Sequence, residues 1–396
     1  MNKKFIAFGG IVSLLIVLAL VGALMLWNTV GERKTATESN SHPVYVGISS
    51  EVGGPLQPYD NNLLFWSETD GSGAVAHPLA HTYFPSIHRF QGGFIAPDRD
   101  SLVALNSDLQ IRQRYVLPGL GAGTQSMATA SPDASVAVYE FNETGRGEGN
   151  AARLAVVDGY GLRETMTTVR PDAVAACDDG TVKWIEHHPD GGELGKPGTA
   201  DLAVWSAGEE IVRKPIDWRF QLIGDGNQLE CSGQYPVVAT DESDTRVSAV
   251  FHENTDSVAV SNIRNFPDIE FAKMGRFYTV HNRTFYSLSE TGRLSAVKLD
   301  RNELLFEQEL NLPGSGEISV TYDGDFAHIV TRPPEFDYRQ SVVSVELSNP
   351  TCQSDAVSLA AYDDISAEAK LKRLGASYMG VLSIYPRQPL DSLGCS

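Results

Sequence analysis

Hydrophobic positions after residue 43 fall in short runs that alternate with turn-forming residues. The runs are rich in β-branched and aromatic side chains, and Gly, Asp, Asn and Pro separate them. Apolar residues spaced for one face of a helix are almost absent from this region. Such a pattern is typical of short strands joined by tight turns. The sequence therefore predicts an all-β domain.

The short runs recur along the chain. Most intervals are about 35 to 50 residues, near the repeat length of propeller blades, and one longer interval separates the fourth and fifth runs. The clearest unit spans residues 275–312, where FYTVH, TFYSL, RLSAVKLD and NELLFEQEL are separated by turns. Four antiparallel strands in one repeat make a propeller blade. The expected first strands of the units are 44–48, 92–96, 127–130, 173–177, 237–240, 277–281 and 318–322.

We therefore predict a seven-bladed β-propeller, preceded by one transmembrane helix. Six blades are the alternative if one run has been split wrongly. A pair of β-sandwiches is the structural rival, and the repeat period argues against it.

Three segments combine a strand, an Asp-containing turn and a second strand: MATASPDASVAVYEF (127–141), AVAACDDGTVKWIE (173–186) and ISVTYDGDFAHIVT (318–331). They resemble the repeat signature of bacterial WD-repeat-like and TolB-like β-propellers. The resemblance covers most of residues 44–358 and implies a propeller fold. The Gly-His and Trp-Asp dipeptides of true WD repeats are missing, so the resemblance implies no particular partner.

An unbroken apolar run without charge, FIAFGGIVSLLIVLALVGALMLW, occupies residues 5–27. About 20 apolar residues cross the hydrocarbon core as a helix. A cleaved secretory signal is the alternative, because Lys3 and Lys4 precede the run and residues 21–23 are small enough for a cleavage site. The run is longer than a usual signal h-region, which favours an uncleaved signal-anchor.

These features divide the chain into four parts. Residues 1–30 form the membrane anchor and the polar residues 31–42 form a flexible linker. Residues 43–364 form an extracytoplasmic propeller on the cell membrane. Residues 365–396 form a short helix and a closing tail.

The C-terminal residues interrupt the repeat. Ser366 can cap a short helix, AEAKLKRL, that Gly375 ends. The extended run YMGVLSIY at 378–385 follows. We expect this run to pair with the first blade and close the ring, because closure removes open sheet edges. The alternative is a tail packed on the outside of the last blade.

The charge of the chain excludes one class of partner. The 396 residues are 42% hydrophobic and carry a formal net charge of -19. An acidic surface of this size repels phosphate backbones, so we expect no nucleic acid partner. The same charge keeps an extracytoplasmic domain soluble.

Four cysteines are widely spaced and contain no CxxC pair: Cys177, Cys231, Cys352 and Cys395. Their spacing fits no zinc site. Two disulfides in an oxidising compartment are expected. We predict the pairs Cys177–Cys231 and Cys352–Cys395, because these close the shortest loops. Four buried free thiols are the alternative.

No motif in the chain indicates a metal, cofactor or catalytic site. His77, His81 and His88 lie close in sequence, but their spacing matches no ligand motif. The Asp-Gly turns at 178–180 and 323–325 lack the full calcium loop and are expected hairpin turns. The motifs of serine hydrolases, zinc proteases and P-loop proteins are missing. We therefore expect no cofactor and favour a protein that is not an enzyme.

Candidate binding residues lie in three long connections, 143–151, 187–200 and 332–340, which we place between the second and third strands of blades. Long loops on a rigid scaffold commonly bind partners. The third loop, RPPEFDYRQ, is the most specific, because arginine and aromatic residues dominate interface hot spots. A solvent-exposed hairpin end is the alternative for it. The candidate residues are Arg332, Phe336, Tyr338, Arg339, Arg146, and His187 with His188, which are expected to point apart on their loop.

Two functions from different classes are compatible with these features. The first is a scaffold or accessory subunit that binds a protein partner in the cell envelope. The second is an envelope hydrolase or lactonase whose site lies over the central channel. The missing catalytic motifs favour the first.

Overall fold

The computed structural model of the chain describes residues 44–52, 61–68, 72–80, 85–119, 124–142, 151–189, 196–223, 227–270, 277–313, 317–332, 340–360 and 377–395. In this part of the chain no helix has the length and the apolar character needed to cross a membrane. The predicted span at 5–27, the linker at 31–42 and the predicted helix after Ser366 lie outside the described residues.

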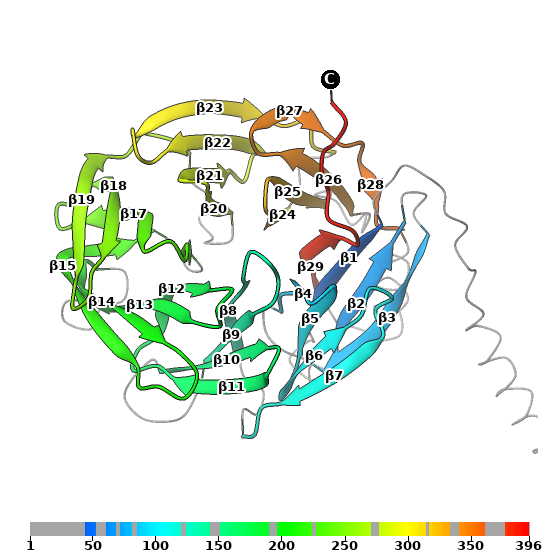
Figure 1. Cartoon of the computed structure of the whole chain (residues 1–396). Helices are drawn as coiled ribbons and strands as arrows, with labels where there is room; N and C mark the ends of the chain where they lie inside the picture. The colour runs from blue at the N-terminus through cyan, green and yellow to red at the C-terminus, as the bar shows by residue number, and fades with distance from the viewer. Residues whose placement is uncertain are drawn as a thin grey trace, which may run out of the picture. The chain divides into compact units, whose positions relative to one another are not determined.

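The described strands form an all-β ring of sheets, each with its strands in order from the axis outwards (Figure 1). Blade 1 comprises β29 (Ser377–Pro386), β1 (Tyr45–Val52), β2 (Asn61–Ser67) and β3 (Gly73–Ala80). Blade 2 comprises β4 (His88–Phe90), β5 (Gly93–Asp98), β6 (Ser101–Leu105) and β7 (Ile111–Val116). Blade 3 comprises β8 (Thr124–Ala130), β9 (Ala137–Asn142), β10 (Ala152–Asp158) and β11 (Gly161–Met166).

Two further sheets complete the other side of the ring. Blade 6 comprises β20 (Tyr278–His281), β21 (Thr284–Leu288), β22 (Arg293–Lys298) and β23 (Glu303–Glu309). Blade 7 comprises β24 (Glu317–Asp323), β25 (Phe326–Arg332), β26 (Ser341–Glu346) and β27 (Asn349–Gln353), and β28 (Val357–Ser358) also pairs with β26.

One eight-stranded sheet holds the strands of blades 4 and 5. Blade 4 comprises β12 (Pro171–Ala176), β13 (Val182–Pro189), β14 (Gly198–Trp205) and the first half of β15 (Val212–Leu222). The last residues of β15 leave blade 4 and pair with β17 (Gln234–Asp241), which continues to β18 (Arg246–Glu253) and β19 (Val258–Asn265). The short strand β16 (Asn227–Gln228) runs parallel to the inner edge of β12.

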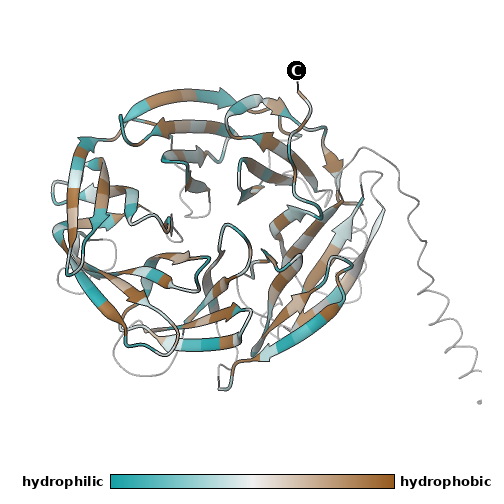
Figure 2. Ribbon diagram, in the orientation of Figure 1, coloured by the Kyte–Doolittle hydropathy of each residue, from teal (hydrophilic) through white to brown (hydrophobic). Residues whose placement is uncertain are grey.

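Hydrophobic clusters fill the spaces between neighbouring blades. The described residues form seven such clusters, and each joins one pair of neighbours around the ring. Between blades 3 and 4, for example, Val138 and Val156 pack with Val174 and Trp184. Both faces of each sheet are therefore buried, while the outer strands β7 and β11 carry long hydrophilic stretches (Figure 2). The seven clusters join one blade to the next in a closed series, so the ring contains seven groups of strands, each of the size of a blade.

The turns follow the predicted chemistry. Asn282 and Arg283 have φ of 51° and 57° between β20 and β21, which is the geometry of a two-residue hairpin turn with the twist of the flanking strands. Gly180 and Gly324 have φ of 84° and 58° in the two predicted Asp-Gly turns. All four strands of the unit predicted at 275–312 are present.

The predicted first strands of three units were wrong. The runs at 44–48, 92–96 and 237–240 belong to β1, β5 and β17, which are second strands; in blade 5 the end of β15 precedes β17. Strand β4, which precedes β5, has only three residues and gives almost no periodic signal. The innermost strand of blade 1 is β29, which comes from the other end of the domain.

The C-terminal strand closes the ring, as predicted for residues 378–385. Strand β29 pairs antiparallel with β1, with Tyr385 opposite Val46 and Ile384 opposite Gly47. Gly47 faces the ring of Phe65, which leaves no room for a side chain, because an added Cβ would lie 2.6 Å from that ring. The same strand packs against blade 7, where Val381 and Ile384 share a cluster with Val330 and Val342.

A set of polar contacts around Arg89, which we call the latch, joins blades 1, 2 and 7 where the ring closes. Arg89 on β4 donates from Nε and Nη2 to Asp323 Oδ2, both at 3.0 Å, and from Nη2 to Pro386 O at 2.7 Å. Its guanidinium lies over the rings of Phe94 and Tyr385, 5.7 and 5.6 Å from their centres. Burial opposes the charge on Asp323, but His328 and Arg89 outweigh it and lower the pKa of Asp323. Arg89 therefore ties blade 2 to blade 7 and to the end of β29.

Replacing Arg89 by Met should keep the packing between the two rings and remove the charge. Asp323 would then lose its cationic partner in a site where its side chain is 22% exposed. We expect the free energy of unfolding to fall by about 3 kcal/mol, measured by urea denaturation. Arg112→Met is the matched control, because Arg112 makes one hydrogen bond from the exposed strand β7 and should cost less than about 0.5 kcal/mol. Equal losses of unfolding free energy in Arg89→Met and Arg112→Met would show that the latch does not stabilise the closed ring.

Candidate functional site

Blade 4 carries charged side chains on both of its faces. Side chains alternate along β13, as on any strand. Ile185 packs in the cluster with blade 5, and Trp184 packs in the cluster with blade 3. The side chain of Lys183 therefore lies on the same face of the blade as Ile185, and that of Glu186 lies on the same face as Trp184. The segment VKWIEHHP therefore places Lys183 in the space between blades 4 and 5 and Glu186 in the space between blades 3 and 4.

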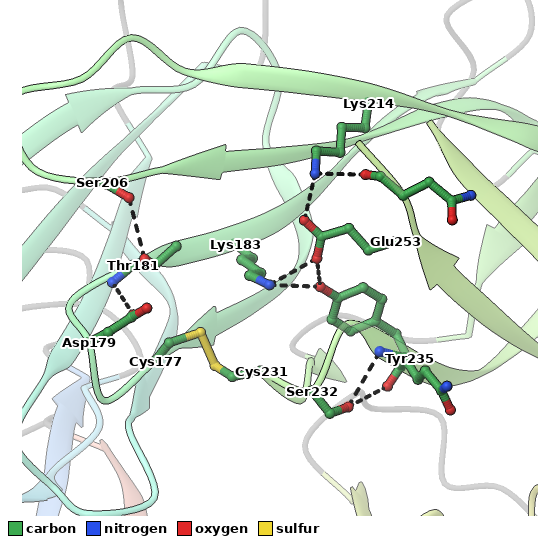
Figure 3. A network of polar contacts seen from close by, with 12 residues as sticks. Cys177, Asp179, Thr181, Lys183, Ser206, Lys214, Cys231, Ser232, Tyr235 and Glu253 are labelled. Atoms are coloured by element: carbon green, nitrogen blue, oxygen red, sulfur yellow. Dashed lines mark hydrogen bonds and ion pairs between the residues drawn. A yellow bond between two sulfur atoms is a disulfide. The ribbon is translucent and has the colours of Figure 1, made fainter. Parts of the chain in front are cut away.

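Four side chains between blades 4 and 5 form what we call the Glu253 network (Figure 3). Lys183 Nζ and Lys214 Nζ donate to the two carboxylate oxygens of Glu253, each at 2.8 Å. Tyr235 donates its hydroxyl hydrogen to Glu253 Oε2, and Lys183 lies 3.1 Å from the Tyr235 oxygen. The lysines come from β13 and β15, and Tyr235 and Glu253 come from β17 and β18. The network therefore fixes blade 5 to blade 4.

The lysines keep Glu253 ionised although it is largely buried. Burial alone would raise its pKa, but the hydrogen bonds from Lys183, Lys214 and Tyr235 outweigh burial and lower the pKa to about 2. Burial and the neighbouring Glu253 carboxylate raise the pKa of Tyr235. The tyrosine thus remains a hydrogen-bond donor throughout the accessible pH range.

A disulfide lies beside this network (Figure 3). Cys177, which follows β12, is bonded to Cys231, which lies between β16 and β17. The second disulfide joins Cys352 to Cys395. Both predicted pairings are confirmed, and the first adds a covalent link between blades 4 and 5.

The space between blades 3 and 4 holds a second set, which we call the Glu186 cluster. The side chain of Glu186 is fully buried. It accepts hydrogen bonds from Trp184 Nε1 at 3.0 Å, Thr168 Oγ1 at 3.1 Å and Arg213 Nε at 2.7 Å. These donors outweigh burial and lower the pKa of Glu186, while Glu186 raises the pKa of Arg213. One edge of the Arg213 guanidinium is held by the carboxylate, and its side chain remains one-third exposed.

A similar pair lies next to this cluster. The side chain of Glu140 on β9 is fully buried, and Arg170 Nε lies 3.6 Å from its Oε1. Arg170 precedes β12 and is 35% exposed. Arg213 is therefore oriented by hydrogen bonds to a buried carboxylate, Arg170 lies beside a second one, and both side chains still reach solvent.

His187 and His188 lie at the end of β13 and not in a loop, because β13 extends to Pro189 and pairs with Gly198 of β14. They point apart, as predicted. His187 Nδ1 is 3.5 Å from Asp172 Oδ2 and its ring lies against Phe220 of β15, whereas His188 Nε2 is 3.3 Å from Asp201 Oδ2. Burial lowers the pKa of His187. The loop between these strands is therefore shorter than predicted and spans residues 190–197.

The other predicted binding residues are placed only in part. Arg332 ends β25, and its Nη1 is 3.3 Å from Glu317 Oε2. Phe336, Tyr338, Arg339 and Arg146 lie outside the described residues. The structure thus places His187 against Asp172 of blade 4 and Phe220 of β15, and it places Arg332 on blade 7.

Strand order fixes the face from which each connection leaves. The connections 143–151, 190–197 and 333–340 join second to third strands in blades 3, 4 and 7. Because β1 is a second strand, the connection at 53–60 leaves from this same face, which the sequence interpretation missed. We call the face that carries these connections the loop face. The turns between third and fourth strands, such as the one at Tyr160, lie on the opposite face, the turn face.

Sequence reasoning also missed Glu186 and Glu253. A signal was present, because Lys183 and Glu186 interrupt an otherwise apolar run, and isolated charges in a buried strand require partners. The partners could not be identified, since Lys214 and Glu253 lie 31 and 70 positions from Lys183 in the sequence. No group of three or more His, Cys, Asp or Glu residues suited to a metal ion occurs among the described residues. The Glu253 network and the Glu186 cluster therefore join neighbouring blades through buried charges.

Comparison with known proteins identifies no family. No protein-family model matches the sequence, and no curated protein matches it. Apo AztD from Citrobacter koseri is 8% identical, with a TM-score of 0.42 over 80% of this chain and 95% of that one. BamB from Moraxella catarrhalis is 13% identical, with a TM-score of 0.33 over 67% and 73%. A functionally unknown protein from Desulfotomaculum acetoxidans is 13% identical, with a TM-score of 0.41 over 79% and 95%. Likeness at this level carries no functional argument, and the propeller assignment rests on the sheet order.

Replacing Glu253 by Gln should destabilise the protein in a pH-dependent way. At pH 7 we expect the free energy of unfolding to fall by about 2 kcal/mol, because two lysines lose a charged acceptor. The folded-state pKa of Glu253 is about 2, below the value of about 4.3 for an unpaired Glu. The native charge therefore stabilises the fold above roughly pH 5, and this contribution is lost as the pH falls towards 2. The difference between the two proteins should shrink between pH 7 and pH 3 in urea denaturation.

Glu309→Gln is the matched control. Glu309 pairs with Arg293 at 2.9 Å but is 79% exposed, so its loss should change stability little at either pH. A difference for Glu253→Gln that does not vary with pH would contradict the assigned role of its charge.

Proposed function

We propose that this protein is an accessory or scaffold subunit of the cell envelope, held to a membrane by residues 5–27, that binds a protein partner through the loop face. The observation that carries the proposal is the gathering of the long connections on that one face. Those at 143–151 and 190–197 leave from adjacent blades, and those at 333–340 and 53–60 leave from blades 7 and 1, which are also adjacent. Binding loops on a rigid scaffold lose less conformational entropy on association.

The base of the first pair of loops supports recognition. Glu186 lies near the end of β13 that leads into the 190–197 connection, and Thr168, which follows β11 of blade 3, donates to it. The Glu253 network joins blades 4 and 5 at the other end of β13. Arg170 and Arg213 present partly exposed guanidinium groups between blades 3 and 4. Arginines in fixed orientations suit carboxylates and backbone carbonyls of a protein. The net charge of -19 disfavours nucleic acid.

The two disulfides support an extracytoplasmic domain. Structural disulfides persist in oxidising compartments and are rare in the cytosol. Cys177–Cys231 and Cys352–Cys395 each join strands or segments of different blades. A membrane anchor at 5–27 would hold such a domain at the outer side of the membrane.

The alternative, an envelope hydrolase or lactonase with a site over the channel, has no observation in its favour among the described residues. The inner edge of β12 is hydrogen-bonded by β16, so at blade 4 this edge is occupied by protein backbone. The charged groups of blade 4 are engaged with each other between the blades. Metal analysis and a substrate screen would follow if no partner is found.

Partner binding can be tested by exchanging loops. The full chain would be purified from native membranes in mild detergent, a purified chain shortened to begin at Gly31 would be added to the same detergent extract, and the partners of both would be identified by mass spectrometry. Both should retain the same stoichiometric envelope protein. Exchange of residues 190–195 for a Gly-Ser sequence of equal length, or the double change Phe336→Ala and Tyr338→Ala, should reduce its capture at least tenfold. The melting temperature should be unchanged, because these residues lie in connections.

Tyr160→Ala is the matched control, since Tyr160 is an aromatic residue 99% exposed on the turn face. It should leave capture unchanged. Loss of capture with Tyr160→Ala and retention with the loop variants would place recognition on the other face. A large fall in melting temperature for the loop variants would show that these residues belong to the core. Absence of any stoichiometric partner with both chains would count against the scaffold function itself.

A further inference from the structure

The chain continues beyond β29 as an arm that returns to blade 7. Strand β29 is the innermost strand of blade 1, whereas β27 is the outer strand of blade 7. The disulfide Cys352–Cys395 bonds the arm to β27. The segment from Arg387 to Cys395 must therefore cross one face of blade 7, as the red C-terminal trace in Figure 1 shows. First strands end at the turn face, so the arm lies on the side opposite to the loop face.

The arm is attached at its two ends. Arg387 is held firmly: its backbone N donates to Val44 O at 2.5 Å, and its side chain donates to Ser107 O at 2.7 Å and Asp108 Oδ1 at 2.5 Å. Between Arg387 and Cys395 the arm makes no hydrogen bond to the described part of the chain. Its residues there are mostly exposed, and only Leu390 and Leu393 are half-buried. The disulfide is thus what keeps the far end of the arm in place.

The two disulfides differ in access to solvent. Cys395 is exposed, although its partner Cys352 is only 1% exposed. Cys177 is 5% exposed and belongs to the cluster between blades 4 and 5, against which Cys231 also packs. A thiolate reacts with a disulfide by direct contact with one sulfur, so access governs the rate. The exposed Cys395 therefore gives an external thiol more access to its disulfide than the half-buried Cys231 gives to the other one.

Ring closure does not depend on the arm. The pairing of β29 with β1 lies before Arg387, and so do the contacts of Arg89 with Asp323 and Pro386. The Arg387 contacts with Ser107 and Asp108 hold the start of the arm to blade 2. The bond at Cys352 can therefore be broken without removing any of the contacts that close the ring.

We propose that Cys352–Cys395 is a redox-releasable strap over the turn face of blade 7, opened by a protein or small-molecule dithiol. A thiolate of the dithiol attacks Sγ of Cys395 and forms a mixed disulfide, and Cys352 leaves as a thiolate that takes up a proton. The second thiol of the reductant then attacks the mixed disulfide, becomes oxidised with its partner, and releases Cys395 as a thiol. Two electrons pass from the dithiol to the strap. Residues 388–395 are then held only through Arg387, and the surface of blade 7 that they cross becomes exposed to solvent.

Graded reduction of the full chain tests the proposal, with dithiothreitol as the dithiol. Samples would be alkylated, digested and analysed by mass spectrometry. Chymotrypsin cleavage at the half-buried Leu390 and Leu393, and hydrogen exchange in β1 and β29, would be measured at the same concentrations. Cys352 and Cys395 should become alkylated at a dithiothreitol concentration at least tenfold below that needed for Cys177 and Cys231. At that point cleavage at Leu390 and Leu393 should become at least tenfold faster, while β1 and β29 keep their protection from exchange.

Paired variants provide the controls. Cys352→Ser with Cys395→Ser should show the fast cleavage of the arm without any reductant, and Cys177→Ser with Cys231→Ser should keep the slow cleavage until dithiothreitol is added. Reduction of both disulfides at one concentration would overturn the proposal. So would unchanged cleavage of the arm after reduction, or simultaneous loss of exchange protection in β29, which would make the arm part of the ring closure. Because reduction is performed on the native sequence, the result does not depend on whether the variants fold.

Discussion

Every sheet of this domain has two apolar faces, and that constraint governs the rest of the structure. A sheet with both faces apolar must have a neighbour on each side, and a row of such sheets ends only when it closes on itself. Six of the seven contacts join blades that follow each other along the chain. The contact between blades 7 and 1 instead joins segments from opposite ends of the domain, such as Tyr45 with Val342. The ring therefore depends on this contact and on Arg89, which bonds to Asp323 across 234 positions of sequence.

Charged side chains give the contacts between blades an orientation that apolar packing does not. Hydrophobic contact is not directional. A buried carboxylate, by contrast, is tolerated only where its donors meet it in good geometry. The donors to Glu186 and Glu253 meet this condition on the two faces of blade 4. For Glu253 the donors come from strands of two different blades. A shift of blade 5 against blade 4 would separate Glu253 from Lys183 and Lys214 and leave three charges with poor solvation. These contacts restrict the blades that carry the 190–197 connection to one arrangement.

The sequence allowed prediction of what is encoded locally. The unit at 275–312 combines strand-forming runs with residues that adopt positive φ at Asn282 and Arg283, and all four of its strands are present. The pairing of the cysteines followed from loop length alone. The run at 378–385 was recognised as the closing strand because it is extended, apolar and outside the repeat.

Features that depend on distant segments escaped prediction. Strand β4 has three residues, too few for a period, so blade 2 was started one strand late. Strand β15 has 11 residues and serves two blades, which lengthened the interval between the fourth and fifth repeats. The buried charges of β13 were visible as residue types, but their partners come from strands whose adjacency exists only in the folded ring. Assigning β1 as a first strand also hid the connection at 53–60 from the set of candidate loops.

The strand order also separates two surfaces that could change independently. An antiparallel four-stranded blade sends its second-to-third connections to one face and its other turns to the opposite face. Loop variation on the first face leaves the turn face and the arm untouched. On the turn face, Arg387 divides the C-terminal segment into β29, which the ring needs, and the arm, which it does not. A covalent bond placed beyond that division can be broken while the contacts that close the ring stay intact.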